Sequence, residues 1–233
     1  MFRSPGPSWQ ISVDAPEDLH LALFVRDASG LTVPDSVGPL RDPPRLASVV
    51  PAGDRAAAAV AWQAWWAALL AAHHATSGHP PEGFTPPQVM AWRYQPRMAV
   101  DTPPDFTGLA VAPALQRAAA QAWREGFRQW WEAPPTAEAS GPRPEVPIGG
   151  VRGGLLAAIM ASSRTRQVPD VVIRLERAMH REVEPFELTI EVLGVRGETA
   201  TMVSPNHALV PIGLYTDSIR YPDWLRQTIA PLA

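Results

Sequence analysis

The stretch that decides the fold class of this chain is Phe186-Glu187-Leu188-Thr189-Ile190-Glu191-Val192-Leu193. Apolar residues occupy every second position from 186 to 192, which is the period of a β-strand with one buried face. Turn residues follow at 194–197, and further strand-forming runs begin at Thr199 and His207. We therefore expect residues 186–193 to form a strand that buries its apolar face and pairs with the segment around residues 199–203.

The N-terminal part of the chain also has a strand-like alternation. Residues 19–25 read Leu-His-Leu-Ala-Leu-Phe-Val, with leucine or valine at every second position. This pattern favours a strand packed on both faces, followed by a turn at 27–30 and a return arm at 31–33. The alternative is a helix, because Asp14-Ala15-Pro16-Glu17 has the spacing of a capping box with proline in the first turn. The strand is our prediction for residues 14–26.

Two long helices are predicted between the terminal strands, at about 54–75 and 113–133. Both are rich in alanine and tryptophan, and both place apolar side chains at the three- and four-residue spacing of one helix face. In the first helix Trp62, Trp65 and Leu69 fall on that face, and Asp54 is a suitable N-cap. Shorter helices are predicted at 153–163, at 169–183, where a strand is the alternative, and from residue 222.

These elements predict an α+β fold. Strands from the N- and C-terminal parts of the chain are expected to form one antiparallel sheet, with the two long Ala/Trp-rich helices packed against it. The 233 residues are predicted to form a single domain, 1–233. The candidate point of division into two lobes is the proline-rich segment 134–147.

The absence of two residue types excludes several kinds of chemistry. The chain contains no cysteine, so disulfides, thiolate metal sites and cysteine nucleophiles are excluded. All 20 basic residues are arginine. Without lysine there can be no P-loop lysine, no pyridoxal Schiff base and no lysine general base.

Net charge and hydropathy narrow the choice of partners. The formal net charge is −3 and the arginines are scattered, so nucleic acid is not expected as a partner. The apolar run 56–72 is just short of the ~20 residues that span a bilayer, and it consists largely of alanine, so a buried helix is predicted and no membrane contact. The first residues lack the apolar run of a signal peptide, which predicts a cytoplasmic location.

A glycine-rich run before a predicted helix is the candidate anion-binding site. Backbone amides at a helix N-terminus bind anions and an arginine adds positive charge, so the site would consist of Gly150, Arg152 and Gly153. The spacing matches neither the dinucleotide-binding pattern nor the Walker pattern. A flexible joint between subdomains is the competing interpretation.

The histidines do not predict a metal site or a catalytic site. His73 and His74 are adjacent in a predicted helix, where neighbouring side chains point about 100° apart and cannot easily share one metal ion. His207 is interpreted as part of an ordinary turn, because no nucleophile motif accompanies it. We predict no catalytic residue, no metal and no cofactor.

The nine tryptophans suggest a binding surface. Trp66 and Trp131 each follow another tryptophan, which places them at the edge of a buried helix face, and tryptophan is enriched at binding hot spots. The predicted function is a non-enzymatic protein–protein interaction protein, such as an adaptor, an inhibitor or immunity-type protein, or an assembly subunit. The alternative is a hydrolase-type enzyme with dispersed Asp, Glu, His and Ser residues, because such sites leave no local motif.

Overall fold

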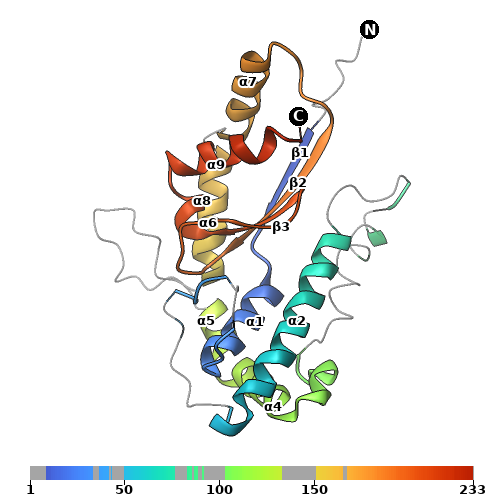
Figure 1. Ribbon diagram of the computed structural model, residues 1–233, viewed down its shortest axis with the longest axis vertical. Coiled ribbons are helices and arrows are strands. Elements are labelled where there is room, and N and C mark those ends of the chain that lie inside the picture. The colour runs from blue at the N-terminus through green and yellow to red at the C-terminus, as the bar shows by residue number, and fades with distance from the viewer. Residues whose placement is uncertain are drawn as a thin grey trace.

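A computed structural model describes residues 9–33, 37–41, 43, 50–76, 83–85, 87–88, 91, 103–132, 151–164 and 167–232. Figure 1 shows two parts: a sheet with helices on one side of it, and a group of helices gathered around the first helix of the chain. The buried apolar side chains of both parts form one continuous cluster. The segment 134–147, where a division was predicted, lies outside the described residues.

Four strands form a mixed sheet in the order β1-β2-β4-β3. They are β1 (Trp9–Asp14), β2 (Phe186–Leu193), β3 (Thr201–Ser204) and β4 (His207–Pro211). β1 and β4 both run parallel to β2, whereas β3 and β4 are antiparallel. The α+β class is thus confirmed, and the prediction of an antiparallel sheet is wrong.

Strand β2 forms where the alternation predicts it and buries the predicted face, which consists of Phe186, Leu188, Ile190 and Val192. Its predicted partner is wrong, because the segment 201–204 pairs with β4 and not with β2. The strand instead lies between two parallel neighbours. Strands in that position are covered on both faces, and this agrees with the burial of every residue from Ile190 to Leu193.

The strand predicted within residues 14–26 is wrong, because Glu17–Ala28 form helix α1. The expected capping box is not formed either: Pro16 is the N-cap without a side-chain hydrogen bond, and the Asp14 carboxylate accepts from the N–H of Ala15. All residues from Leu19 to Arg26 are buried. A helix with no exposed face has no polar stripe, so its sequence is not distinguishable by periodicity from a buried strand.

Helix α2 (Arg55–Ala75) and the helical run from 113 to 132 surround α1. That run consists of α4 (Pro113–Ala122), a π-helical turn η3 (Trp123–Phe127) and α5 (Arg128–Glu132). Two short 3-10 helices, η1 (Ala52–Asp54) and η2 (Thr107–Val111), precede α2 and α4. Helices α2 and α4 both contact α1, and they also contact each other.

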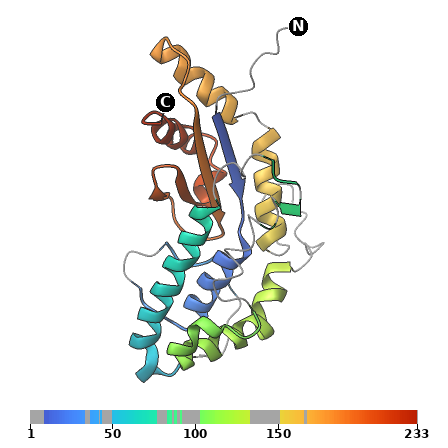
Figure 2. The same cartoon turned by 90° about the vertical axis from the view of Figure 1, so that its right-hand side faces the viewer.

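The remaining helices are α6 (Val151–Arg164), α7 (Gln167–Met179), α8 (Ile212–Tyr215) and α9 (Arg220–Ile229). They lie on one side of the sheet, and Figure 2 shows the end of α6 next to the start of α7. In the part of the chain that the structure describes, no helix combines the length and the hydropathy needed to cross a membrane.

The segment 37–41 ties α1 to the turn that follows β2. The buried guanidinium of Arg26 donates to the carbonyl oxygen of Gly38 at 2.9 Å. Leu40 forms an antiparallel bridge with Val195. A Cβ atom at position 38 would lie 1.9 Å from the carbonyl oxygen of Arg196, so the close approach of these two backbones requires glycine there.

Candidate functional site: a buried histidine–carboxylate cluster

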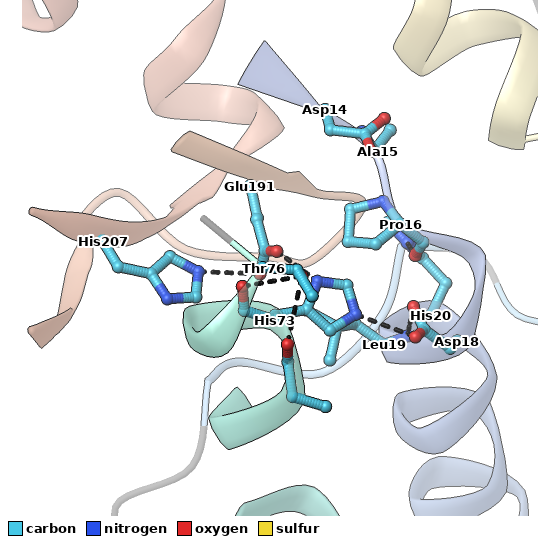
Figure 3. A network of polar contacts seen from close by, with 11 residues as sticks. Asp14, Ala15, Pro16, Asp18, Leu19, His20, His73, Thr76, Glu191 and His207 are labelled. Atoms are coloured by element: carbon cyan, nitrogen blue, oxygen red, sulfur yellow. Dashed lines mark hydrogen bonds and ion pairs between the residues drawn. The ribbon is translucent and has the colours of Figure 1, made fainter. Parts of the chain in front are cut away.

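The strongest candidate site lies where the C-terminal end of α2 meets the sheet (Figure 3). His73 occupies the last turn of α2, and the helix is closed by Thr76, whose hydroxyl donates to the carbonyl oxygen of Ala72 at 3.1 Å. The unpaired carbonyl groups at a helix C-terminus carry partial negative charge and favour a cation. The fold therefore places His73 where a protonated imidazole is stabilised.

Two carboxylates hold the ring of His73 from opposite sides. Its Nδ1 is hydrogen bonded to Glu191 Oε1, and its Nε2 lies 2.8 Å from Asp18 Oδ2 in the first turn of α1. Burial alone would lower the pKa of His73, but the hydrogen bonds and charges of Asp18 and Glu191 outweigh burial and raise it to about 9. His73 is therefore an imidazolium at neutral pH, and it donates a hydrogen bond to each carboxylate.

Glu191 is brought to this point by the alternation of β2. Its side chain lies on the opposite face from Ile190 and Val192, and Asp14 of β1 is its neighbour across the sheet. The residue is 1% exposed because the end of α2 covers it. Burial alone would raise the pKa of Glu191, but its contacts with His207 and His73 lower it to about 2. The carboxylate is therefore ionised although it is buried.

His207, the first residue of β4, lies on the other side of Glu191. Its Nε2 is 3.1 Å from Glu191 Oε2, but the alignment does not satisfy a hydrogen bond, and both ring nitrogens are buried without a hydrogen-bond partner. Its ring stacks on the exposed His74, with centroids 6.0 Å apart. Ser204 Oγ lies 3.4 Å from Nδ1 of His74. His207 thus lies between the buried carboxylate of Glu191 and the polar side chains of His74 and Ser204.

A third buried histidine, His20, connects the start of α1 to the end of β2. Nδ1 of His20 donates to the carbonyl oxygen of Pro16 at 2.6 Å, because Nε2 must accept the N–H of Gly194 at 3.0 Å. Burial lowers the pKa of His20 to about 4, against the opposing effect of the Pro16 carbonyl and the nearby carboxylates. This histidine is neutral where His73 is charged, and the two rings have different roles.

The cluster consists of charged side chains that contact one another and have little contact with solvent. His73 keeps its proton through the neutral range, so it cannot serve as a general base there. The side chains of His73 and Glu191 are buried, and contact with solvent runs through Asp18, whose side chain is 30% exposed. Over the described ranges, no three His, Asp or Glu side chains are arranged to hold a metal ion.

The two tryptophans predicted to form a partner surface lie in different environments. Trp131 is 1% exposed and packs against His20 with ring centroids 4.5 Å apart, so its predicted exposure is wrong. The π-helical turn before α5 changes the rotation of the helix, and a wheel drawn for a regular α-helix does not apply there. Trp66 is half-buried and stacks on Trp62 at 5.4 Å, which agrees with a position at the edge of the buried face.

The predicted anion site is described only in part. Arg152 and Gly153 are exposed in the first turn of α6, whereas Gly150 lies outside the described residues. Among the described residues, the Arg152 side chain forms no hydrogen bond or ion pair that would support a site with Gly150 and Gly153. The anion site therefore stays a prediction from the sequence.

Sequence reasoning considered His73 and His207 separately and missed that both contact one carboxylate. His207 is buried and not part of an ordinary turn, which corrects that interpretation. The signal that could have pointed to Glu191 is its position among Ile190, Val192 and Leu193, at the apolar end of β2. Comparisons with protein-family models, with curated proteins and with solved structures found no match to this chain. Function is therefore inferred from its own residues and contacts.

Proposed function

We propose that the protein acts by binding another protein, and that exposed apolar side chains on α6 and α7 form part of the binding surface. The observation that supports this proposal is the exposure of Leu156 (42%), Met160 (55%) and Ile173 (42%). Leu156 and Met160 are four residues apart and share one helix face, to which the exposed Gly153 and Ala157 also belong. A helix that faces only solvent normally carries charged residues in such a stripe.

The state of the buried cluster favours binding over catalysis. A catalytic group has to reach the reacting atoms, yet His73, Glu191 and His207 are enclosed and contact one another. Their arrangement suits a fixed joint between α1, α2 and the sheet. Trp66 remains a candidate for a second contact surface on α2, since it is partly exposed.

The test is affinity capture from the source organism after cross-linking, with wild-type protein and the double variant Leu156→Gln/Met160→Gln. The matched control is Val60→Gln/Val111→Gln, which removes two exposed apolar residues from other elements. We expect one or more proteins to be captured by the wild type and by the control and lost with the α6 variant, while all three melt at similar temperatures. Capture of the same proteins by the α6 variant contradicts the proposal.

Trp66→Ala is the third variant in the same experiment. Its indole stacks on the buried Trp62, so truncation is expected to lower stability as well as remove surface. Loss of a partner with no loss of stability would assign the binding surface to α2. Loss of stability alone would identify Trp66 as part of the core.

A hydrolase-type enzyme is the second candidate, and one observation favours it. Both ring nitrogens of His207 and Oε2 of Glu191 lack a hydrogen bond, which is unusual for buried polar atoms and is found at functional sites. Hydrolysis of model ester, amide or phosphate substrates by the purified protein, abolished by Glu191→Gln in a variant that still folds, would replace the binding proposal with this one.

A further inference from the structure

The helices that carry the exposed apolar side chains also carry most of the unbalanced positive charge of the chain. Residues 151–180 contain five arginines, against Asp170 and Glu176 as acidic residues, which gives a formal charge of +3. Arg181 is not counted, because it forms an ion pair with Glu184 at 3.8 Å. The whole chain carries −3, so the remainder carries −6. The basic charge is thus concentrated on α6, α7 and the residues that flank α7.

Exposed arginines lie beside the exposed apolar positions on both helices. Arg174 follows Ile173 directly and shares a helix face with Arg177, and both guanidinium groups are exposed. On α6, Arg152 is exposed one turn before Leu156. Within the described parts of the chain, none of these three arginines forms an ion pair with a carboxylate, although Nε of Arg174 donates to the carbonyl oxygen of Asp170.

We infer that the partner of the α6–α7 surface is an acidic amphipathic protein segment, in which apolar side chains alternate with clusters of Asp or Glu. This inference rests on the proposed binding function and adds the chemistry of the partner. Apolar groups of the segment would cover Leu156, Met160 and Ile173, while its carboxylates would pair with Arg174 and Arg177. Arginine suits this role because its guanidinium binds carboxylates in a bidentate manner.

Two other anionic partners fit the same surface less well. Helices that lie on membranes insert a broad apolar face of tryptophan, phenylalanine and leucine, whereas residues 151–181 contain no tryptophan, phenylalanine or tyrosine. Among the described residues of α6 and α7, the exposed large apolar side chains are Leu156, Met160 and Ile173. Nucleic-acid surfaces are strongly positive and polar, whereas here Asp170 and Glu176 interrupt the arginines and three apolar side chains are exposed beside them. An acidic protein segment is the partner that uses both the apolar and the basic residues.

The test uses three synthetic helical peptides with identical leucine positions and with Glu, Gln or Lys at every polar position. Their affinities for the full chain are measured by fluorescence anisotropy at low and at physiological ionic strength. We expect the Glu peptide to bind most tightly and the Lys peptide most weakly, with a difference that shrinks as salt is added. Arg174→Gln/Arg177→Gln should weaken binding of the Glu peptide about threefold to tenfold.

The matched control is Arg117→Gln/Arg124→Gln, which removes two exposed arginines from the α4 and η3 region and should leave the peptide affinities unchanged. Equal binding of the three peptides, or an equal effect of both arginine pairs, overturns the inference. Tighter binding of phosphatidylglycerol vesicles or single-stranded DNA through Arg174 and Arg177 also overturns it. If Leu156→Gln/Met160→Gln still loses its captured protein in that case, the binding function stands and the acidic partner does not.

Discussion

Glu191 is a buried carboxylate in β2, a strand inside the sheet, and its position there is energetically costly unless its charge is balanced. The balance comes from His73, whose imidazolium donates to Glu191 on one side and to Asp18 on the other. Each of these residues depends on the others, because removal of one charge leaves an uncompensated charge in the interior. Because of this mutual dependence, we expect conservative substitutions of these residues to lower the free energy of unfolding strongly.

Glu191→Gln is expected to lower the free energy of unfolding by about 3–5 kcal/mol, because it leaves the imidazolium of His73 without one of its two carboxylates. The matched control is Glu187→Gln, which lies on the same face of β2 but is half-buried. It should cost less than about 1 kcal/mol. Urea denaturation measures the free energy of unfolding of both variants. Equal losses would show that the buried ion pair contributes no more to stability than the half-buried Glu187.

The pKa of His73 predicts how stability depends on pH. Because the folded pKa of about 9 lies above the ordinary value of 6.5, the favourable contribution is complete below pH 6.5 and is lost as the pH rises through 9. It amounts to about 3 kcal/mol, since one pKa unit corresponds to about 1.4 kcal/mol. His20 has the opposite sign: its folded pKa of about 4 means that stability falls as the pH drops from 6.5 to 4.

The free energy of unfolding should therefore be greatest near pH 6.5 and decrease on both sides. In His73→Gln the loss between pH 6.5 and 9 should disappear, while the loss on the acidic side remains. Chemical denaturation at a series of pH values measures both limbs. A wild-type profile that is flat from neutral to alkaline pH would refute the assigned protonation of His73.

At the scale of elements, local pattern was informative where one face of an element is exposed. The alternation of residues 186–193 predicts β2 and its buried face, because polar and apolar neighbours differ in burial there. Helix α1 has no exposed face, so the same reasoning interpreted its apolar run as a strand. The pairing of the strands could not be predicted from local pattern either, because β1 and β2 are hydrogen bonded but far apart in the sequence.

The candidate site was unpredictable for a related reason. His73 and Glu191 are 118 residues apart in the sequence, and neither position has a motif around it. The pairing of β4 with β2 brings His207 to Glu191, and the end of α2 places His73 between Glu191 and Asp18. The residue types were visible in the sequence, whereas their convergence is a property of the topology.

Gly38→Ala tests the segment 37–41 that connects α1 to the turn after β2. The added methyl group would meet the carbonyl oxygen of Arg196, so we expect a loss of about 1–3 kcal/mol from overpacking. Gly153→Ala is the control, because a methyl group at that position would meet no neighbouring element within 4 Å and alanine favours the helix by up to about 1 kcal/mol. Thermal melts that rank the two variants in the opposite order would contradict the close backbone approach.

At the scale of the whole molecule, the cluster joins the helical part to the sheet part. Asp18 lies in α1 and His73 in α2, both in the helical part, while Glu191 and His207 belong to the sheet. The continuous apolar core adds to this connection. The two parts are therefore expected to unfold in one transition.

This cooperativity can be measured with one probe for each part. Tryptophan fluorescence in urea reports mainly on α2, η3 and α5, which contain six of the nine tryptophans. Hydrogen exchange of peptides from β2 and β4 in urea reports on the sheet. The urea concentrations at which the two probes show half-unfolding should coincide in the wild type and differ in Glu191→Gln. Separate midpoints in the wild type would mean that the parts are stable independently.

The parallel pairing of β1 with β2 also has a consequence for synthesis on the ribosome. Residues 9–14 emerge early, but their sheet partner at 186–193 is translated only after most of the chain has been made. The contacts of α1 with α2 and α4 involve residues up to 122, so the helical part can assemble first. Until residues 186–193 leave the exit tunnel, both edges of β1 are unpaired and His73 lacks one of its two carboxylates, Glu191. Unpaired strand edges favour aggregation, so we expect the nascent chain to need chaperones during that interval.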